Sequence, residues 1–174
     1  AELDYAIRHS GCKALFLAPA VRGFDCIAAA IEVRAQTPAL EHLFLLDESA
    51  HAGAIGWADF MAQSTRTKAA ALKHAIDAVA PEDAVSIQFT SGTTGTPKGA
   101  TLSHLNLVNN GSQIGARLGL SAEDRICLPV PMFHCFGMVV GVLGAFAHGA
   151  TVVFPGESFD AGICLATIAA QRCT

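Results

Sequence analysis

The sequence has 174 residues, of which 52% are hydrophobic and 15% are charged, and its formal net charge is −4. This apolar content excludes an intrinsically disordered chain, because it supplies ample material for a hydrophobic core. The 11 basic residues are outnumbered by 15 acidic ones. The chain therefore lacks the excess positive charge that binding to a polyanion such as DNA requires.

A long uncharged run raises the question of a membrane span, since no Asp, Glu, Lys or Arg occurs between Arg125 and Glu157. A spanning helix needs about 20 apolar residues. Prolines and histidines divide the run, and only residues 135–147 remain as continuous apolar helix material. We expect a buried core helix there, no membrane span, and a cytoplasmic protein, leaving open a leader upstream of residue 1.

The cysteines show no pattern of a metal site or a disulfide framework, because no Cys-x2-Cys pair occurs. We expect buried free thiols in a reducing environment. The six cysteines are Cys12, Cys26, Cys127, Cys135, Cys164 and Cys173.

Hydrophobic spacing predicts helices that alternate with short strands. In the first half the expected elements are a helix over residues 3–10, a strand over 12–18, a helix capped by Asp25, a strand over 43–46, and helices over 57–63 and 68–79. In the second half they are a strand over 85–89, a helix from Ser103 to Leu118, a strand over 126–130, a helix over 135–147, a strand over 151–154 and a helix over 159–171. The alternation predicts an α/β fold, with a mostly parallel sheet flanked by helices.

The ten residues from Thr90 to Gly99 combine three glycines, five hydroxyl side chains and one lysine directly after an expected strand. Glycines let backbone N–H groups approach a polyphosphate, hydroxyls donate to its oxygens, and a lysine adds positive charge. The alternative interpretation is a hydroxyl-rich flexible loop or hairpin turn that binds no ligand. A Walker A loop fits poorly, because it requires glycine where Pro97 stands and Ser or Thr where Gly99 stands.

Residues 91–99, Ser-Gly-Thr-Thr-Gly-Thr-Pro-Lys-Gly, resemble the phosphate-binding signature of the adenylate-forming (AMP-binding) ligases. This superfamily includes acyl-CoA synthetases, firefly luciferase and the adenylation domains of peptide synthetases. A chance match at the eight fixed positions is on the order of 10⁻⁹ per site from average composition. The resemblance continues through residues 100–106 and, less specifically, back to Glu2, Leu3, Tyr5 and residues 11–16.

In that family the enzyme joins a carboxylate to AMP with release of pyrophosphate, and then transfers the acyl group to a thiol, usually that of CoA. The resemblance implies ATP, Mg²⁺ and CoA as cofactors of the intact enzyme, and a small carboxylic acid as its substrate. It also implies that the loop closes over the ATP phosphates, so we expect residues 92–98 to be mobile without nucleotide. The implied phosphate-binding residues are Thr90, Ser91, Gly92, Thr93, Thr94, Gly95, Thr96, Pro97 and Lys98.

Residues 129–138, Pro-Val-Pro-Met-Phe-His-Cys-Phe-Gly-Met, resemble the substrate-side motif of the same family. The resemblance places His134 beside the carboxylate, where a neutral imidazole can donate a hydrogen bond, and Phe136 and Met138 in an apolar acyl pocket. Val139 and Val142 are further candidates for that pocket. Taken alone, a histidine before an apolar helix is more often a hydrogen-bonded core or capping residue. No residue is assigned to a metal.

The same segment favours one branch of the family. Amino-acid adenylation domains usually carry an Asp here that pairs with the substrate amine, whereas this segment has no acidic residue. The segment resembles medium-chain fatty-acyl-CoA synthetases most, with aryl-CoA and luciferase-like ligases as alternatives.

The sequence departs from the family pattern, since it has no Tyr-Gly-x-Thr-Glu motif, no Thr-Gly-Asp motif and no lysine after Lys98. The resemblance then implies a partial N-terminal AMP-binding domain that lacks the C-terminal lid domain and a complete catalytic set, and is inactive by itself. We divide it into a first α/β portion, residues 1–84, and a portion with the phosphate loop and acyl pocket, residues 85–174. The alternative is a non-catalytic nucleotide-binding module from a degenerate ligase.

Overall fold

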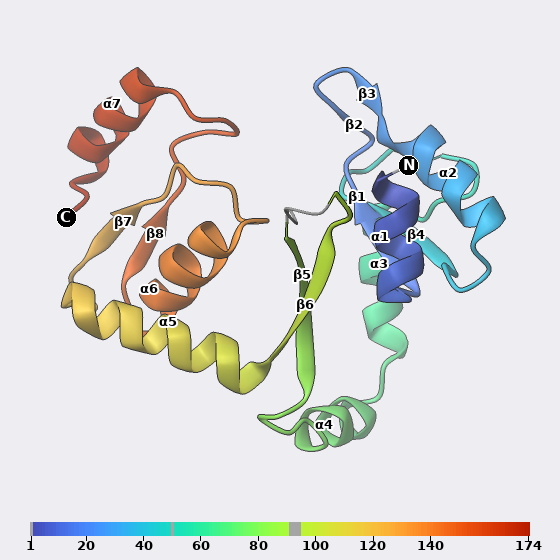
Figure 1. Cartoon of the computed structure of the whole chain (residues 1–174), viewed down its shortest axis with the longest axis horizontal. Helices are drawn as coiled ribbons and strands as arrows, with labels where there is room; N and C mark the ends of the chain where they lie inside the picture. The colour runs from blue at the N-terminus through green and yellow to red at the C-terminus, as the bar shows by residue number, and fades with distance from the viewer. Residues whose placement is uncertain (1, 50, 91–94) are drawn as a thin grey trace. The chain divides into compact units, whose positions relative to one another are not determined.

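The computed structural model describes residues 2–49, 51–90 and 95–174, which adopt an α/β fold (Figure 1). The chain divides into two compact units. Unit 1 comprises Ala1–Val79 and Phe89–Gly99, and unit 2 comprises Ala80–Gln88 and Ala100–Thr174. The described strands form two-stranded pairs. One pair in each unit joins strands that are distant in sequence, and both of these pairs are parallel. This confirms the predicted fold class, while the division at residue 84 stays a prediction about domain organisation.

Unit 1 is built on two parallel strands with helices around them. Its elements are α1 (Glu2–Ser10), β1 (Ala14–Leu17), β2 (Ala20–Val21), β3 (Phe24–Asp25), α2 (Cys26–Gln36), β4 (His42–Leu45), α3 (Trp57–Ala62), the 3₁₀ helix η1 (Gln63–Arg66) and α4 (Ala69–Asp77). β1 and β4 pair from Ala14↔His42 to Leu17↔Leu45. Parallel neighbours need a crossover connection, and α2 lies in it.

The core of unit 1 consists of apolar side chains from α1, α2, β1, β4 and the segment between α2 and β4. Its buried members are Ile7, Leu17, Ile27, Ala30, Leu40, Leu43 and Leu45. The N-terminus of α2 is capped as predicted, because the Asp25 carboxylate accepts a hydrogen bond from the Ala28 N–H at 2.9 Å. The core therefore fixes α1 and α2 on the β1–β4 pair.

The hairpin of β2 and β3 is a feature that hydrophobic spacing does not predict. Its two turn residues, Arg22 and Gly23, have φ values of 50° and 80°. Positive φ at both central positions is what a type I′ turn requires, and Asn-Gly or Asp-Gly is its usual sequence signal. An arginine rarely adopts this backbone conformation, so the sequence gives no such signal.

Unit 2 contains most of the second half of the chain. Its complete elements are α5 (His104–Leu118), β7 (Arg125–Cys127), the π-helix η2 (Phe136–Leu143), α6 (Gly144–Ala147), β8 (Thr151–Val153) and α7 (Ala161–Gln171). β7 and β8 are parallel, α6 contacts both α5 and β8, and α7 contacts β7 (Figure 1). β5 (Ala84–Thr90) and β6 (Lys98–Ser103) pair with each other and have residues in both units.

Helix α5 has the predicted start and a defined end. Ser103 and Asn106 form a capping box, in which the Asn106 N–H donates to Ser103 Oγ at 3.2 Å and the Ser103 N–H donates to Asn106 Oδ1 at 3.0 Å. At the other end Gly119 has a φ of 70°, and the Leu120 N–H donates to the Gly115 carbonyl at 3.0 Å. This is the Schellman arrangement, which glycine adopts without strain.

The helix expected over residues 135–147 exists, but its first part, η2, is a π-helix. A side chain at Gly137 would collide with the Pro131 carbonyl, so the chain enters η2 in close contact with the preceding turn. The helix is also only partly buried, since the exposed fractions of Phe136 and Phe146 are 53% and 69%. No helix in the described parts of the chain is long and apolar enough to span a membrane.

Glycines allow α5 to lie directly against the η2–α6 segment. A β carbon at Gly111 would lie 2.8 Å from Leu143 Cβ, and one at Gly115 would lie 2.8 Å from the Gly144 carbonyl oxygen and would collide with the His148 ring. Both glycines are buried. The ring of His148 is held at this contact by Nε2, which lies 2.9 Å from the Ser112 carbonyl oxygen.

We predict that Gly115→Ala destabilises the protein by about 1–3 kcal/mol, because the added methyl group overpacks a contact made partly by backbone. Gln113→Ala, at an exposed position of the same helix, should change the free energy of unfolding by less than about 0.5 kcal/mol. Urea denaturation of both variants checks the difference. Equal stability of the two variants would contradict the close packing.

Candidate functional site

The candidate phosphate loop connects β5 to β6. The structure describes Thr90 and residues 95–98 of it, whereas Ser91, Gly92, Thr93 and Thr94 lie outside the described residues. The expected mobility of residues 92–98 falls partly on those positions and stays a prediction. The described residues nevertheless fix how the loop begins and ends.

The two ends of the loop are joined by a hydrogen bond, because Thr90 Oγ1 donates to the Lys98 carbonyl oxygen at 3.4 Å. Gly95 has a φ of 94°, and a β carbon there would meet none of the described residues within 4 Å, its sequence neighbours aside. The Gly95 position thus needs glycine for its backbone conformation and not for space.

Lys98 is the only lysine of the loop segment, and it is exposed. Among the described residues, the ion pairs involve other cations and no carboxylate pairs with Lys98. An ammonium group without a carboxylate partner is available for charge-assisted hydrogen bonds to an anionic ligand. Exposed Thr96 adds a hydroxyl donor, whereas the hydroxyl proton of Thr90 is already used in the hydrogen bond to the Lys98 carbonyl oxygen.

His134 lies in unit 2, at the turn that precedes η2, and is exposed. Its Nδ1 accepts a hydrogen bond from the Phe136 N–H at 3.1 Å. A neutral imidazole that accepts at Nδ1 carries its proton on Nε2. The ring therefore caps the first turn of η2 and keeps Nε2–H as a donor for a ligand.

An apolar groove of about 410 Å³ lies between α5 and η2 in unit 2. Its lining residues are Leu102, Asn106, Leu107, Asn110, Cys135, Phe136, Val139 and Val140. None of them is charged. The volume lies within the usual range for small-molecule sites, about 300–1,000 Å³.

Of the candidate substrate residues, Phe136 lines this groove, and so does the further candidate Val139. His134, Met138 and Val142 are not among its lining residues. The wall formed by β6 and α5, which includes Leu102, Asn106 and Leu107, is not predicted from the sequence. The spacing of Asn106 and Asn110, one helical turn apart, was the only available signal.

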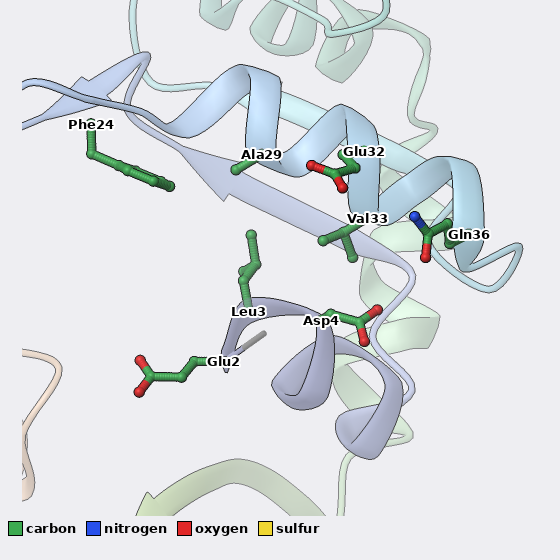
Figure 2. A pocket seen from close by; sticks show the side chains of 8 residues that line it. All are labelled: Glu2, Leu3, Asp4, Phe24, Ala29, Glu32, Val33 and Gln36. Carbon is green, nitrogen blue, oxygen red and sulfur yellow. The ribbon is translucent and has the colours of Figure 1, made fainter.

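A second cavity, of about 810 Å³, lies in unit 1 between α1 and α2 (Figure 2). Its wall carries the carboxylates of Glu2, Asp4 and Glu32 beside apolar Leu3 and Val33. No lysine or arginine is among its described lining residues. Carboxylates repel phosphate, so this larger cavity does not suit the phosphates of a nucleotide.

The cysteines are free thiols, but they are less uniformly buried than expected. Cys164 is buried, whereas Cys135, which lines the groove, is exposed. Partial burial raises the pKa of the Cys127 thiol, and the neighbouring thiols of Cys173 and Cys164 raise it further. The described residues contain no group of three or more side chains suited to hold a metal ion.

We predict that iodoacetamide at pH 8 labels Cys135 several-fold faster than Cys127. The thiolate is the reactive form, and a raised pKa leaves less of it at Cys127. The ratio of the two labelling rates should fall as the pH rises toward the pKa of Cys127, because more of the Cys127 thiol is then ionised. Peptide mass spectrometry after timed quenching measures both rates, and unfolding in urea provides the control in which they converge.

Comparison with known proteins gives consistent matches over the whole chain. Residues 1–174 match the family described as AMP-binding enzyme. The chain is 36% identical over 179 residues to acyl-CoA ligase SID4 of Ajellomyces capsulatus, covering 100% of this chain and 30% of that protein. It is 34% identical over 201 residues to the mitochondrial medium-chain acyl-CoA ligase ACSF2 of Bos taurus, covering 98% of this chain and 31% of that protein.

Among solved structures, the anthranilate CoA ligase AuaEII in complex with anthranoyl-AMP superposes with a TM-score of 0.79 at 28% identity. The match covers 99% of this chain and 32% of that structure. The chain spans about 30% of the length of the curated relatives that it matches.

Proposed function

This chain belongs to the AMP-binding enzyme family, and we propose that it forms part of an ATP-dependent acyl-CoA ligase. The proposed enzyme activates a carboxylic acid as an acyl-adenylate and transfers the acyl group to CoA. The observation that supports this most is the loop between β5 and β6, within a sequence that matches the family throughout. The loop has glycines, hydroxyls and Lys98, which has no carboxylate partner among the described residues.

Lys98 and the loop hydroxyls are the proposed ligands of the ATP phosphates. ATP supplies the adenylyl group and pyrophosphate as the leaving group. The Lys98 ammonium and the Thr96 hydroxyl would stabilise the negative charge that develops on that leaving group. The Thr90 hydroxyl would join them once it releases the Lys98 carbonyl oxygen. Ser91, Gly92, Thr93, Thr94, Gly95 and Pro97 complete the proposed set on sequence grounds.

Mg²⁺ is assigned to no residue of this chain. The described parts offer no cluster of three metal-ligating side chains, so we derive no step through the ion. Acidic motifs of the kind that bind magnesium in the family are absent from the sequence. We propose that residues outside this chain hold it.

The proposed acid-binding residues are His134, Phe136 and Met138. The uncharged groove beside Phe136 suits an apolar acyl group, because a charged substituent would lose its hydration there without a partner. We propose a medium-chain fatty acid as the substrate. An aryl acid is the second candidate, favoured by the similarity to a ligase crystallised with anthranoyl-AMP.

We also propose that the chain is a partial N-terminal domain that is inactive by itself. Large apolar side chains of unit 2 are exposed, including Phe159 at 71% and Leu165 at 68%, as expected if further protein covers them. A non-catalytic nucleotide-binding module is the alternative. We propose a cytoplasmic location; mitochondrial import, as the name of the Bos taurus relative states for that protein, is the alternative location.

We predict that Lys98→Ala in the intact enzyme raises the barrier to pyrophosphate formation by about 1–3 kcal/mol, because a charge-assisted contact to the leaving group is lost. Lys73→Ala, which removes an exposed lysine paired with Asp77 at 2.7 Å, should leave the rate unchanged. ATP–pyrophosphate exchange with octanoate measures both. The 174-residue chain alone should show no exchange.

An unchanged rate for Lys98→Ala would remove this lysine from the mechanism. Exchange by the chain alone would overturn the proposal that it is incomplete. Binding of nucleotide by an intact protein that never forms an adenylate would instead favour the non-catalytic module.

We predict that Phe136→Ala lowers kcat/KM for octanoate. The expected loss of transition-state stabilisation is about 1–2 kcal/mol, which is the scale expected for lost apolar contact. Butyrate, which reaches less of the groove, should be affected much less. Phe133→Ala is the matched control, because Phe133 is 85% exposed and does not line the groove. Equal losses for the two acids would contradict an acyl role for the groove.

A further inference from the structure

A hydrogen bond joins the first helix of unit 1 to the end of the phosphate loop. The Tyr5 hydroxyl donates to the Pro97 carbonyl oxygen at 2.8 Å, across 92 positions of sequence. Both residues are half-buried. Pro97 has no N–H, so this carbonyl is the only backbone group through which a hydrogen bond can hold it.

This bond constrains the residue that follows. The Pro97 carbonyl and the Lys98 N–H belong to one planar peptide unit, and the ring of Pro97 fixes its own φ. A hydrogen bond that holds the Pro97 carbonyl therefore also fixes the orientation of the Lys98 N–H and of the Lys98 backbone that follows it. Lys98 is also the first residue of β6, so its position is constrained from both sides.

The other end of the loop touches the same helix. The Tyr5 ring lies edge-on to the Phe89 ring at 6.2 Å and stacks on the His9 ring at 5.2 Å, and His9 lies 6.1 Å from Phe89. Tyr5 and His9 are one helical turn apart and so share a face of α1. Phe89 directly precedes Thr90, where the loop begins.

The supporting helix is itself fixed. Ile7, between Tyr5 and His9, is 3% exposed and belongs to the core of unit 1. Side chains on a rigid, core-packed element hold a site more accurately than side chains on a loop do. The aromatic face of α1 thus connects the core to both ends of the loop.

We propose that Tyr5 is a positioning residue that orients Lys98 toward the ATP phosphates through its hydrogen bond to the Pro97 carbonyl. The inference rests on the proposed function, since it assumes that Lys98 binds phosphate. In this role Tyr5 acts through the backbone of the loop and not by contact with the nucleotide.

Tyr5→Phe in the intact enzyme removes the hydroxyl and keeps the ring contacts. We expect KM for ATP to rise about three- to tenfold, the range for one lost hydrogen bond, while KM for the carboxylic acid stays within about twofold. Ser10→Ala is the matched control: it removes another α1 hydroxyl, which donates to the Ile7 carbonyl at 3.3 Å and does not reach the loop. ATP–pyrophosphate exchange at varied ATP and varied acid separates the two constants.

Limited trypsin digestion without nucleotide gives a readout that does not need activity. Tyr5→Phe should speed cleavage of the Lys98–Gly99 bond several-fold relative to cleavage after Lys73, because the backbone around Lys98 opens locally. General unfolding would instead speed cleavage at both lysines. Faster cleavage at Lys98 alone supports the constraint.

The proposal is overturned if the Lys98 cleavage ratio is unchanged, or if an active enzyme shows equal KM increases for ATP and acid. An intact protein without any exchange activity would refute the proposed function. The cleavage ratio would then decide by itself whether Tyr5 holds the backbone at Lys98.

Discussion

Contact between backbones is the constraint on which unit 2 depends. Gly111 and Gly115 are one helical turn apart on α5 and allow Leu143 and Gly144 to approach without an intervening side chain. This contact brings η2 alongside α5, so that Phe136 and Val139 face Asn106 and Leu107 across the groove. The groove is therefore made by the smallest residues as much as by the large ones that line it.

The π-helical form of η2 belongs to the same constraint. Gly137 lies against the Pro131 carbonyl, and Gly141 lies against the Leu128 side chain. These contacts hold η2 against residues 128–131, which follow β7, while the Phe136 N–H donates to His134 Nδ1. The backbone thus determines which imidazole nitrogen remains a donor, which is a property of the fold and not of the histidine alone.

Local chemistry accounts for what the sequence predicted well. The sequence predicts Asp25 as a helix cap and Ser103 as a helix start because side chains of this kind accept a hydrogen bond from a backbone N–H close by, and both residues accept one from the residue three positions on. The β2–β3 hairpin was missed because its turn uses an arginine at positive φ. The α5 wall of the groove and the Tyr5–Pro97 bond join segments distant in sequence. Such contacts leave no periodicity to read in a single sequence.

The distribution of charge separates the surfaces of this chain by the ligand that each suits. The largest described cavity is lined by three carboxylates, which repel phosphate, so its large volume does not make it a candidate nucleotide site. Lys98 has no carboxylate partner in the described residues, and none of the described residues that line the groove of unit 2 is charged. Lys98 thus suits an anion, and the groove suits an uncharged acyl chain, because a charged group buried in the groove would lose its hydration without gaining a partner. Charge, more than cavity size, thus supports the proposal that the ATP phosphates bind at Lys98 and the acyl group of the acid binds in the groove.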